Sequence, residues 1–145
     1  MEIYSIGFTQ KTAEQFFTAV KDRGIQRLLD VRLNNASQLA GFSKRDDLAY
    51  LLKAICGAEY IHDLSLAPTQ EMLDAYKKNK GSWESYESEF LALMAARRIE
   101  ATLDRGLFQR PTVLLCSELK AEHCHRRLVL EYLQEKWGDI EIRHL

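Results

Sequence analysis

The sequence predicts an α/β fold: a single domain with a mainly parallel β-sheet flanked by helices on both faces. Short apolar segments of strand character alternate along the chain with segments of helical periodicity. Such alternation produces right-handed strand–helix–strand crossovers, which make the strands parallel and place the helices on the faces of the sheet. The length of 145 residues suits one ordinary domain, and no repeat or linker interrupts it, so we expect residues 1–145 to form one unit.

Three strands and two helices are expected in the first 61 residues. The first helix begins at Thr12, which forms a capping-box pattern with Gln15, and it ends at Gly24. The second helix begins near Ser43 and ends at Gly57, with leucines and isoleucine at helical spacing between them. The strands expected in this part are 3–6, 25–31 and a weaker one at 59–61.

The second half of the chain continues the alternation. The segment from Thr112 to Cys116 is the clearest buried strand, because it is a continuous apolar run of the kind that parallel sheets use. Helical patterns cover 69–78, 83–105 with Gly106 as the stop, and 122–137, and a final strand is expected at 140–143.

Composition limits the class of partner. The chain is 46% hydrophobic and 28% charged, which is typical of a globular protein, and its net charge is −1. We therefore expect no extended surface for duplex DNA and no membrane partner. A basic pocket for one small anionic ligand, including a nucleotide, is compatible with this net charge. Three cysteines without a signal peptide predict reduced thiols and a cytoplasmic location. The oligomeric state is left open.

Polar residues of chemical interest follow each of the first four expected strands. Because the carboxyl ends of parallel strands meet at one edge of a sheet, these residues are expected to converge there. The candidate site residues are Gly7, Thr9, Asp30, Arg32, His62, Cys116, Glu118, Cys124, His125 and Arg126.

These residue types suggest specific roles. Arg32 and Arg126 would bind an anion through their planar donors. Cys116 would be a nucleophile whose thiolate is favoured by a helix start and by Arg126. Glu118 and His125 would move protons. The expected substrate-binding set is completed by Gly7, Thr9, Asp30, His62 and Cys124.

Several of these residues also have a purely structural interpretation. Cys116 could be core packing at the end of a strand, and Asp30 with Arg32 could be a local ion pair. Two known phosphate motifs are absent: the cysteine phosphatase spacing of Cys, five residues and Arg fails from both Cys116 and Cys124, and no Walker or GxGxxG loop occurs. The lysines around Lys77 are expected on a solvated helix face. Trp83, Tyr86, Phe90 and Cys56 are expected in the core.

No metal or other cofactor is expected, with zinc kept as an alternative. The ligands would be Cys116 with His123, Cys124 or His125, and His62 would be a fourth. Neither a CxxC nor an HxxxH pair occurs, and three adjacent residues on a helix do not face one ion. A disulfide between Cys116 and Cys124 is a further alternative.

Several motifs together resemble a known family. They are Ser5-Ile6-Gly7-Phe8-Thr9, Leu29-Asp30-Val31-Arg32, Gly41-Phe42, Tyr60-x-His62-x-Leu64, and Cys116-x-Glu118 followed by Cys124-His125-Arg126. The set resembles the domain of unknown function family 488 over nearly the whole chain. The chain departs from that pattern after His62, where the family usually has Leu-Gly and this sequence has Leu64-Ser65-Leu66-Ala67-Pro68.

The resemblance implies a compact α/β domain and supports Arg32, Cys116, Glu118, Cys124, His125 and Arg126 as the site. It supplies no reaction, although some members of the family are associated with nucleic acids or nucleotides. We expect an enzyme that acts on a small anionic substrate, nucleotide or nucleic-acid-related, at the carboxyl edge of the sheet. The alternatives are a non-catalytic module that binds a nucleotide or a protein through the same edge, and a zinc-stabilised structural domain.

Overall fold

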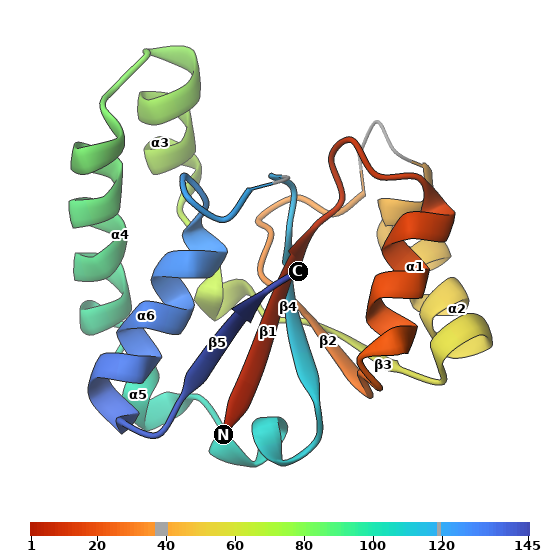
Figure 1. Ribbon diagram of the computed structural model, residues 1–145. Helices are drawn as coiled ribbons and strands as arrows, with labels where there is room; N and C mark the ends of the chain where they lie inside the picture. Colours follow the sequence, from red (N-terminus) through yellow and green to blue (C-terminus); the bar gives the residue numbers. More distant parts are fainter. Residues whose placement is uncertain (37–40, 119) are drawn as a thin grey trace.

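Five parallel strands form the centre of the computed structural model, which describes residues 1–36, 41–118 and 120–145. Their order in the sheet is β3-β2-β4-β1-β5, and every neighbouring pair is parallel, as Figure 1 shows. The prediction of a single α/β domain built on a parallel sheet is therefore confirmed. The strands are β1 (Glu2–Gly7), β2 (Arg27–Asp30), β3 (Glu59–His62), β4 (Thr112–Cys116) and β5 (Glu141–His144).

Helices cover both faces of this sheet (Figure 1). One face carries α1 (Ala13–Asp22), α2 (Arg45–Leu51) and the π-helical turn η2 (Leu52–Cys56) that continues α2. The other face carries α3 (Gln70–Leu73), its π-helical continuation η4 (Asp74–Lys78), α4 (Trp83–Ala96), α5 (Ile99–Thr102) and α6 (His125–Trp137).

Alternate residues of each strand supply the two apolar layers. In β4, Leu114 packs into the layer beneath α4 and α6, whereas Val113 and Leu115 pack into the layer beneath α1 and α2. This follows from the strand period of two residues. Because a central strand of the sheet is buried on both sides, the continuous apolar run of β4 has a direct structural explanation.

The first helix begins as predicted. The Thr12 hydroxyl accepts a hydrogen bond from the Gln15 N–H at 3.1 Å, and the Gln15 side chain accepts one from the Thr12 N–H at 2.9 Å. This reciprocal capping box satisfies two N–H groups that the first turn leaves free. Phe16, Phe17 and Val20 are buried on the inner face of the helix.

The helix expected over 83–105 is broken. α4 ends at Ala96, and Arg98 adopts a left-handed backbone conformation with φ of 53° before the short helix α5 begins. The Arg97 side chain donates to the carbonyl oxygens of Ser65 and Ala67 at 2.7 and 2.8 Å. Gly106 stops no helix, because it lies within the 3₁₀ segment η5 (Arg105–Gln109).

The helix expected over 122–137 begins three residues late. α6 starts at His125, and Cys124 is its N-cap residue with an extended backbone, φ −138° and ψ 138°. The Cys124 N–H instead donates to the Ala121 carbonyl in a turn before the helix. Cys124 therefore lies outside the helical spiral, which changes where its thiol points.

The remaining boundaries shift by a few residues. The strand expected at 25–31 is limited to Arg27–Asp30, and the one expected at 140–143 is Glu141–His144. The helix expected from Ser43 begins at Arg45 after a 3₁₀ turn, η1 (Gly41–Ser43). Within the described parts of the chain, no helix is both long and apolar enough to cross a membrane.

The connections of the sheet create a crevice at its carboxyl edge. β2 and β4 are neighbours, but the helix that follows β2 lies on one face and the helix that follows β4 lies on the other. Their outgoing segments therefore separate in opposite directions. Open α/β sheets bind their ligands at such a switch point.

Candidate functional site

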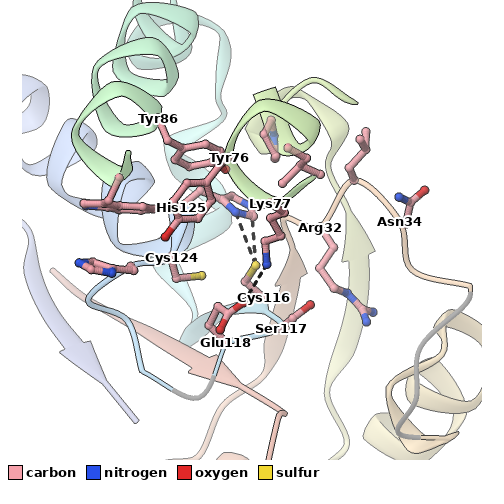
Figure 2. A pocket seen from close by; sticks show the side chains of 15 residues that line it. Arg32, Asn34, Tyr76, Lys77, Tyr86, Cys116, Ser117, Glu118, Cys124 and His125 are labelled. Carbon is pink, nitrogen blue, oxygen red and sulfur yellow. Dashed lines mark hydrogen bonds and ion pairs between the residues drawn. The ribbon is translucent and has the colours of Figure 1, made fainter. Parts of the chain in front are cut away.

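A cavity of about 190 Å³ lies at this crevice. The segments after β2 and β4 meet there with η4, the start of α4 and the N-terminus of α6, as Figure 2 shows. The lining residues that carry polar or aromatic groups are Arg32, Asn34, Tyr76, Lys77, Trp83, Tyr86, Cys116, Ser117, Glu118, His123, Cys124 and His125.

Cys116 and His125 are in contact at this cavity. The Cys116 Sγ lies 3.5 Å from His125 Nδ1 and 3.8 Å from Nε2, while His125 Nε2 lies 2.7 Å from the carbonyl oxygen of Val31. A carbonyl only accepts, so Nε2 must carry the hydrogen, and the lone pair of the neutral ring is then on Nδ1, beside the thiol. Burial lowers the pKa of His125, which favours this neutral form.

Cys124 completes a buried pair of thiols. The pKa of Cys116 is lowered, first because the Cys124 S–H donates to it; burial opposes this, and the Ser117 backbone and the Arg126 charge support it. The pKa of Cys124 is raised, first because its S–H is held by Cys116 and then because it is buried. In this pair Cys116 is therefore the more acidic thiol and Cys124 the less acidic one.

Lys77 and Glu118 form an ion pair at the cavity, with 3.0 Å between Nζ and Oε1. Their side chains are 55% and 46% exposed, so the pair is in water and can exchange partners. Burial lowers the pKa of Lys77, but the hydrogen bond and charge of Glu118, followed by the influence of the nearby Cys116 and Cys124, outweigh this effect, so the net pKa is raised. The predicted solvated position of Lys77 agrees with this exposure, and only the tertiary structure shows that the residue also lines the cavity.

Aromatic rings form one wall of the cavity. Trp83 stacks on His123 with 4.9 Å between ring centroids and on Tyr86 with 5.2 Å, and Tyr76 lies 5.1 Å from Tyr86. The helical spacing of Trp83 and Tyr86 had predicted core positions, and both are indeed buried. The spacing cannot distinguish a core from a cavity wall, because the same face of the helix serves both.

The Arg32 guanidinium is already bound inside the protein. Its Nε and Nη2 donate to the two carboxylate oxygens of Asp30 at 2.9 and 2.8 Å, and Nη2 also donates to the Ser43 carbonyl. The Tyr60 hydroxyl donates to the same carboxylate at 2.5 Å. Arg32 is 3% exposed, and its Nη1 is buried with no hydrogen-bond partner among the described residues. Figure 2 shows this side chain turned away from Cys116 and His125.

Arg126 is fully buried and does not line the cavity. Its Nη1 donates to the backbone carbonyl of Glu118 at 2.6 Å, and its Nε donates to the Ser5 hydroxyl at 3.2 Å. Gly7 allows this arrangement, because a Cβ at that position would lie 1.6 Å from the Glu118 carbonyl oxygen. Arg126 and Gly7 thus shape the segment after β4 rather than the cavity surface.

Thr9 and His62 also lie outside the cavity lining. Thr9 donates twice to the Ser117 carbonyl, from its N–H at 3.0 Å and from its hydroxyl at 2.5 Å. His62 Nε2 donates to the Arg32 carbonyl at 2.7 Å, and its Nδ1 lies 3.1 Å from the Asn35 side-chain nitrogen. Both residues fix the backbone of the segments that carry the cavity residues.

The sequence-predicted set therefore divides into two layers. The cavity lining contains Arg32, Cys116, Glu118, Cys124 and His125. The layer behind it contains Gly7, Thr9, Asp30, His62 and Arg126, which hold the lining segments in position.

The fold and the site define an α/β protein with a paired-thiol and imidazole cavity at the switch point of a parallel sheet. The family model described as Domain of unknown function DUF488 matches residues 12–133 of the chain. The protein belongs to this family. Comparisons with curated proteins and with solved structures find no match.

Proposed function

We propose that the protein is an enzyme that acts on a small anionic substrate, nucleotide or nucleic-acid-related, with Cys116 as the nucleophile. The observation that carries this proposal is the position of Cys116, which lines the cavity with its Sγ 3.5 Å from Nδ1 and 3.8 Å from Nε2 of His125. A thiol beside a base that is itself oriented by a third group, here the Val31 carbonyl, is the usual arrangement of an activated nucleophile.

The groups around Cys116 suggest how a reaction would proceed. The Cys116 thiolate attacks an electrophilic centre of the substrate, and the Cys124 S–H stabilises that thiolate beforehand. His125 Nδ1 accepts the Cys116 proton as the thiolate forms; when the sulfur bonds to the electrophilic centre, the bond to the leaving group breaks and His125 gives the proton to that group. An incoming anion replaces Glu118 as the partner of Lys77, which frees the carboxylate for proton transfer.

The lining supports a substrate with a planar ring and an anionic group. The stacked wall of Tyr76, Trp83 and Tyr86 suits a nucleobase face, since stacking on aromatic side chains is worth about 1–3 kcal/mol per base. Lys77 supplies the positive charge. The cavity of about 190 Å³ is smaller than the roughly 300–1,000 Å³ of drug-sized sites, so a base or a chain end fits better than a whole polymer.

Two alkylating reagents of equal size test this proposal directly. Iodoacetate is an anion and iodoacetamide is neutral, and both react with the same thiolate, so the ratio of their rates reports the preference of the site for anions. We expect Cys116 to be alkylated by both reagents, with an iodoacetate-to-iodoacetamide ratio above that of free cysteine. Peptide mass spectrometry assigns the label to Cys116 rather than to Cys56 or Cys124.

Matched lysine variants provide the control. Lys77→Gln should lower the ratio at Cys116, because it removes the cation paired with Glu118 in the lining, whereas Lys78→Gln should not, because Lys78 pairs with Asp74 and is 76% exposed. If Cys116 resists both reagents in folded, metal-free protein, it is not an activated nucleophile and the proposed role is wrong. A ratio equal to that of free cysteine would refute the anion site.

One observation favours the alternative of a non-catalytic binding module. Nε and Nη2 of Arg32, and Nε and Nη1 of Arg126, donate to groups of the protein itself, which is the arrangement of a structural scaffold. In that case Cys116→Ser would leave the binding of a nucleotide such as AMP intact, and no turnover would exist to lose. In either case we place the protein in the cytoplasm, because a reducing compartment keeps two thiols this close from forming a disulfide.

A further inference from the structure

Three side chains of the cavity form a group of potential metal ligands. The sulfur atoms of Cys116 and Cys124 and a ring nitrogen of His125 all lie within 4.8 Å of one another, and all three residues are buried. Two thiolates and one imidazole match the ligand chemistry of zinc, which prefers sulfur and nitrogen in tetrahedral arrangement.

The distances agree with a tetrahedral ion. For zinc bonds of about 2.0 Å to nitrogen and 2.3 Å to sulfur, the nitrogen–sulfur edge of a tetrahedron is about 3.5 Å. The separation of His125 Nδ1 from Cys116 Sγ is 3.5 Å. The other pairs lie within 4.8 Å, so side-chain movements of about 1 Å bring them to the roughly 3.5–3.8 Å of the remaining edges.

The tautomer of the imidazole already suits this role. Metal-binding histidines usually donate their second ring N–H to a carbonyl or carboxylate, which fixes the tautomer. His125 Nε2 donates to the Val31 carbonyl at 2.7 Å, which leaves the lone pair on Nδ1. Cys116 Sγ lies 3.5 Å from Nδ1 and 3.8 Å from Nε2, so a rotation of the ring directs that lone pair at the ion.

The helix start explains how adjacent residues can share one ion. Cys124 and His125 would diverge on a regular helical turn, but Cys124 is an extended N-cap residue outside the helix. His123 is directed elsewhere, since its ring stacks on Trp83. Adjacent residues on a helix do not face one ion, but this spacing argument does not apply to Cys124 and His125, because Cys124 precedes the helix.

We propose that the reduced protein binds one Zn²⁺ through Cys116, Cys124 and His125, with the fourth position open to the cavity. The two thiols lose their protons on binding, and the two thiolates balance the charge of the ion. This inference rests on the proposed function, because zinc would regulate the same site. A Cys116 sulfur that is bound to zinc has its lone pair engaged and cannot attack a substrate. Zinc thus holds the enzyme inactive and protects its thiols.

Cobalt and zinc titrations of the full chain test the site. Co²⁺ added to reduced protein should produce thiolate-to-cobalt charge-transfer absorption and intense tetrahedral d–d bands that saturate at one ion per chain, and Zn²⁺ should displace them. Cys116→Ser and Cys124→Ser should weaken binding by more than about 100-fold, since changes in the outer shell alone cost 10- to 100-fold. Cys56→Ser is the matched control, because Cys56 lies in η2 and its thiol bonds to the Phe17 carbonyl. Binding by both serine variants at the wild-type level, or absence of the tetrahedral bands, would overturn the site.

A second measurement needs no variant and separates this inference from the proposed function. One equivalent of Zn²⁺ should slow the alkylation of Cys116 and Cys124 by iodoacetamide at least about tenfold, leave Cys56 unchanged, and be reversed by a chelator. If Cys116 reacts rapidly with or without zinc, the metal site is wrong and the nucleophile stands. If zinc binds but Cys116 stays inert after chelation, the metal site stands and the proposed enzyme is wrong.

Discussion

The side chain of Asp30 accepts four hydrogen bonds in the layer behind the cavity. It is fully buried, and its partners are the Arg32 guanidinium, which donates twice, the Arg32 backbone N–H and the Tyr60 hydroxyl. The same carboxylate raises the pKa of Tyr60, after the larger effect of burial. A buried ion pair of this kind contributes little net stability while both partners are present, but removing one partner leaves a buried charge uncompensated.

Asp30→Asn should therefore lower the free energy of unfolding by about 3–5 kcal/mol, as expected for breaking a buried pair. Urea denaturation followed by circular dichroism measures the change. Asp46→Asn is the matched control, because its pair with Arg45 is exposed, at 56% and 87%, and should be nearly neutral. Equal effects of the two variants would mean that Arg32 finds another partner.

At the scale of elements, the segment between β4 and α6 decides the geometry of the site. It carries Glu118 and Cys124, two of the five predicted residues that line the cavity, and it directly follows a third, Cys116, at the end of β4. Arg126 and Thr9 hold it from behind through hydrogen bonds to its backbone. Its close approach to β1 depends on Gly7, where any side chain would meet the Glu118 carbonyl.

Gly7→Ala should displace this segment and destabilise the protein by about 3 kcal/mol, the upper range for overpacking, because the new methyl meets rigid backbone. The rate at which Cys116 is alkylated should change at the same time, since this residue ends β4 directly before the displaced segment. Gly41→Ala is the control, as a Cβ there meets no atom of the described residues within 4 Å. Thermal denaturation together with alkylation kinetics checks both effects, and a wild-type melting temperature for Gly7→Ala would contradict the packing argument.

At the scale of the whole molecule, the sheet couples two apolar layers. Phe16 is fully buried in one layer, whereas Trp83 and Trp137 contact the other. Neighbouring residues of one strand, such as Leu114 and Leu115, belong to opposite layers. We therefore expect the two layers to unfold together, as small single domains usually do.

Phe16→Ala tests this coupling, because it should lower the free energy of unfolding by about 3–5 kcal/mol through the cavity that it leaves. Tryptophan fluorescence, which reports the opposite layer, should shift to the same lower urea midpoint as circular dichroism. Tyr50→Ala, at a side chain 72% exposed, serves as the control and should have little effect. Separate fluorescence and circular dichroism transitions would show that the layers unfold independently.

The order of the elements and the edge that carries the site could be predicted from local patterns. Apolar periods of two and 3.6 residues are local properties of the sequence, so the strands and most helices could be predicted from it. The capping box at Thr12 and the polar residues that follow the strands could be predicted in the same way. The break at Arg98 was not visible, because distant carbonyls of Ser65 and Ala67 hold the preceding Arg97.

The sequence by itself determined the parallel α/β architecture and the convergence of Cys116, Glu118, Cys124 and His125 at one edge of the sheet. Only the tertiary structure decided which charged groups face the cavity. Lys77 lines the cavity from η4, whereas the Arg126 guanidinium donates to the backbone carbonyl of Glu118. The physical reason is that periodicity depends on neighbours along the chain, while the partner of a guanidinium or a thiol depends on residues that only folding brings near.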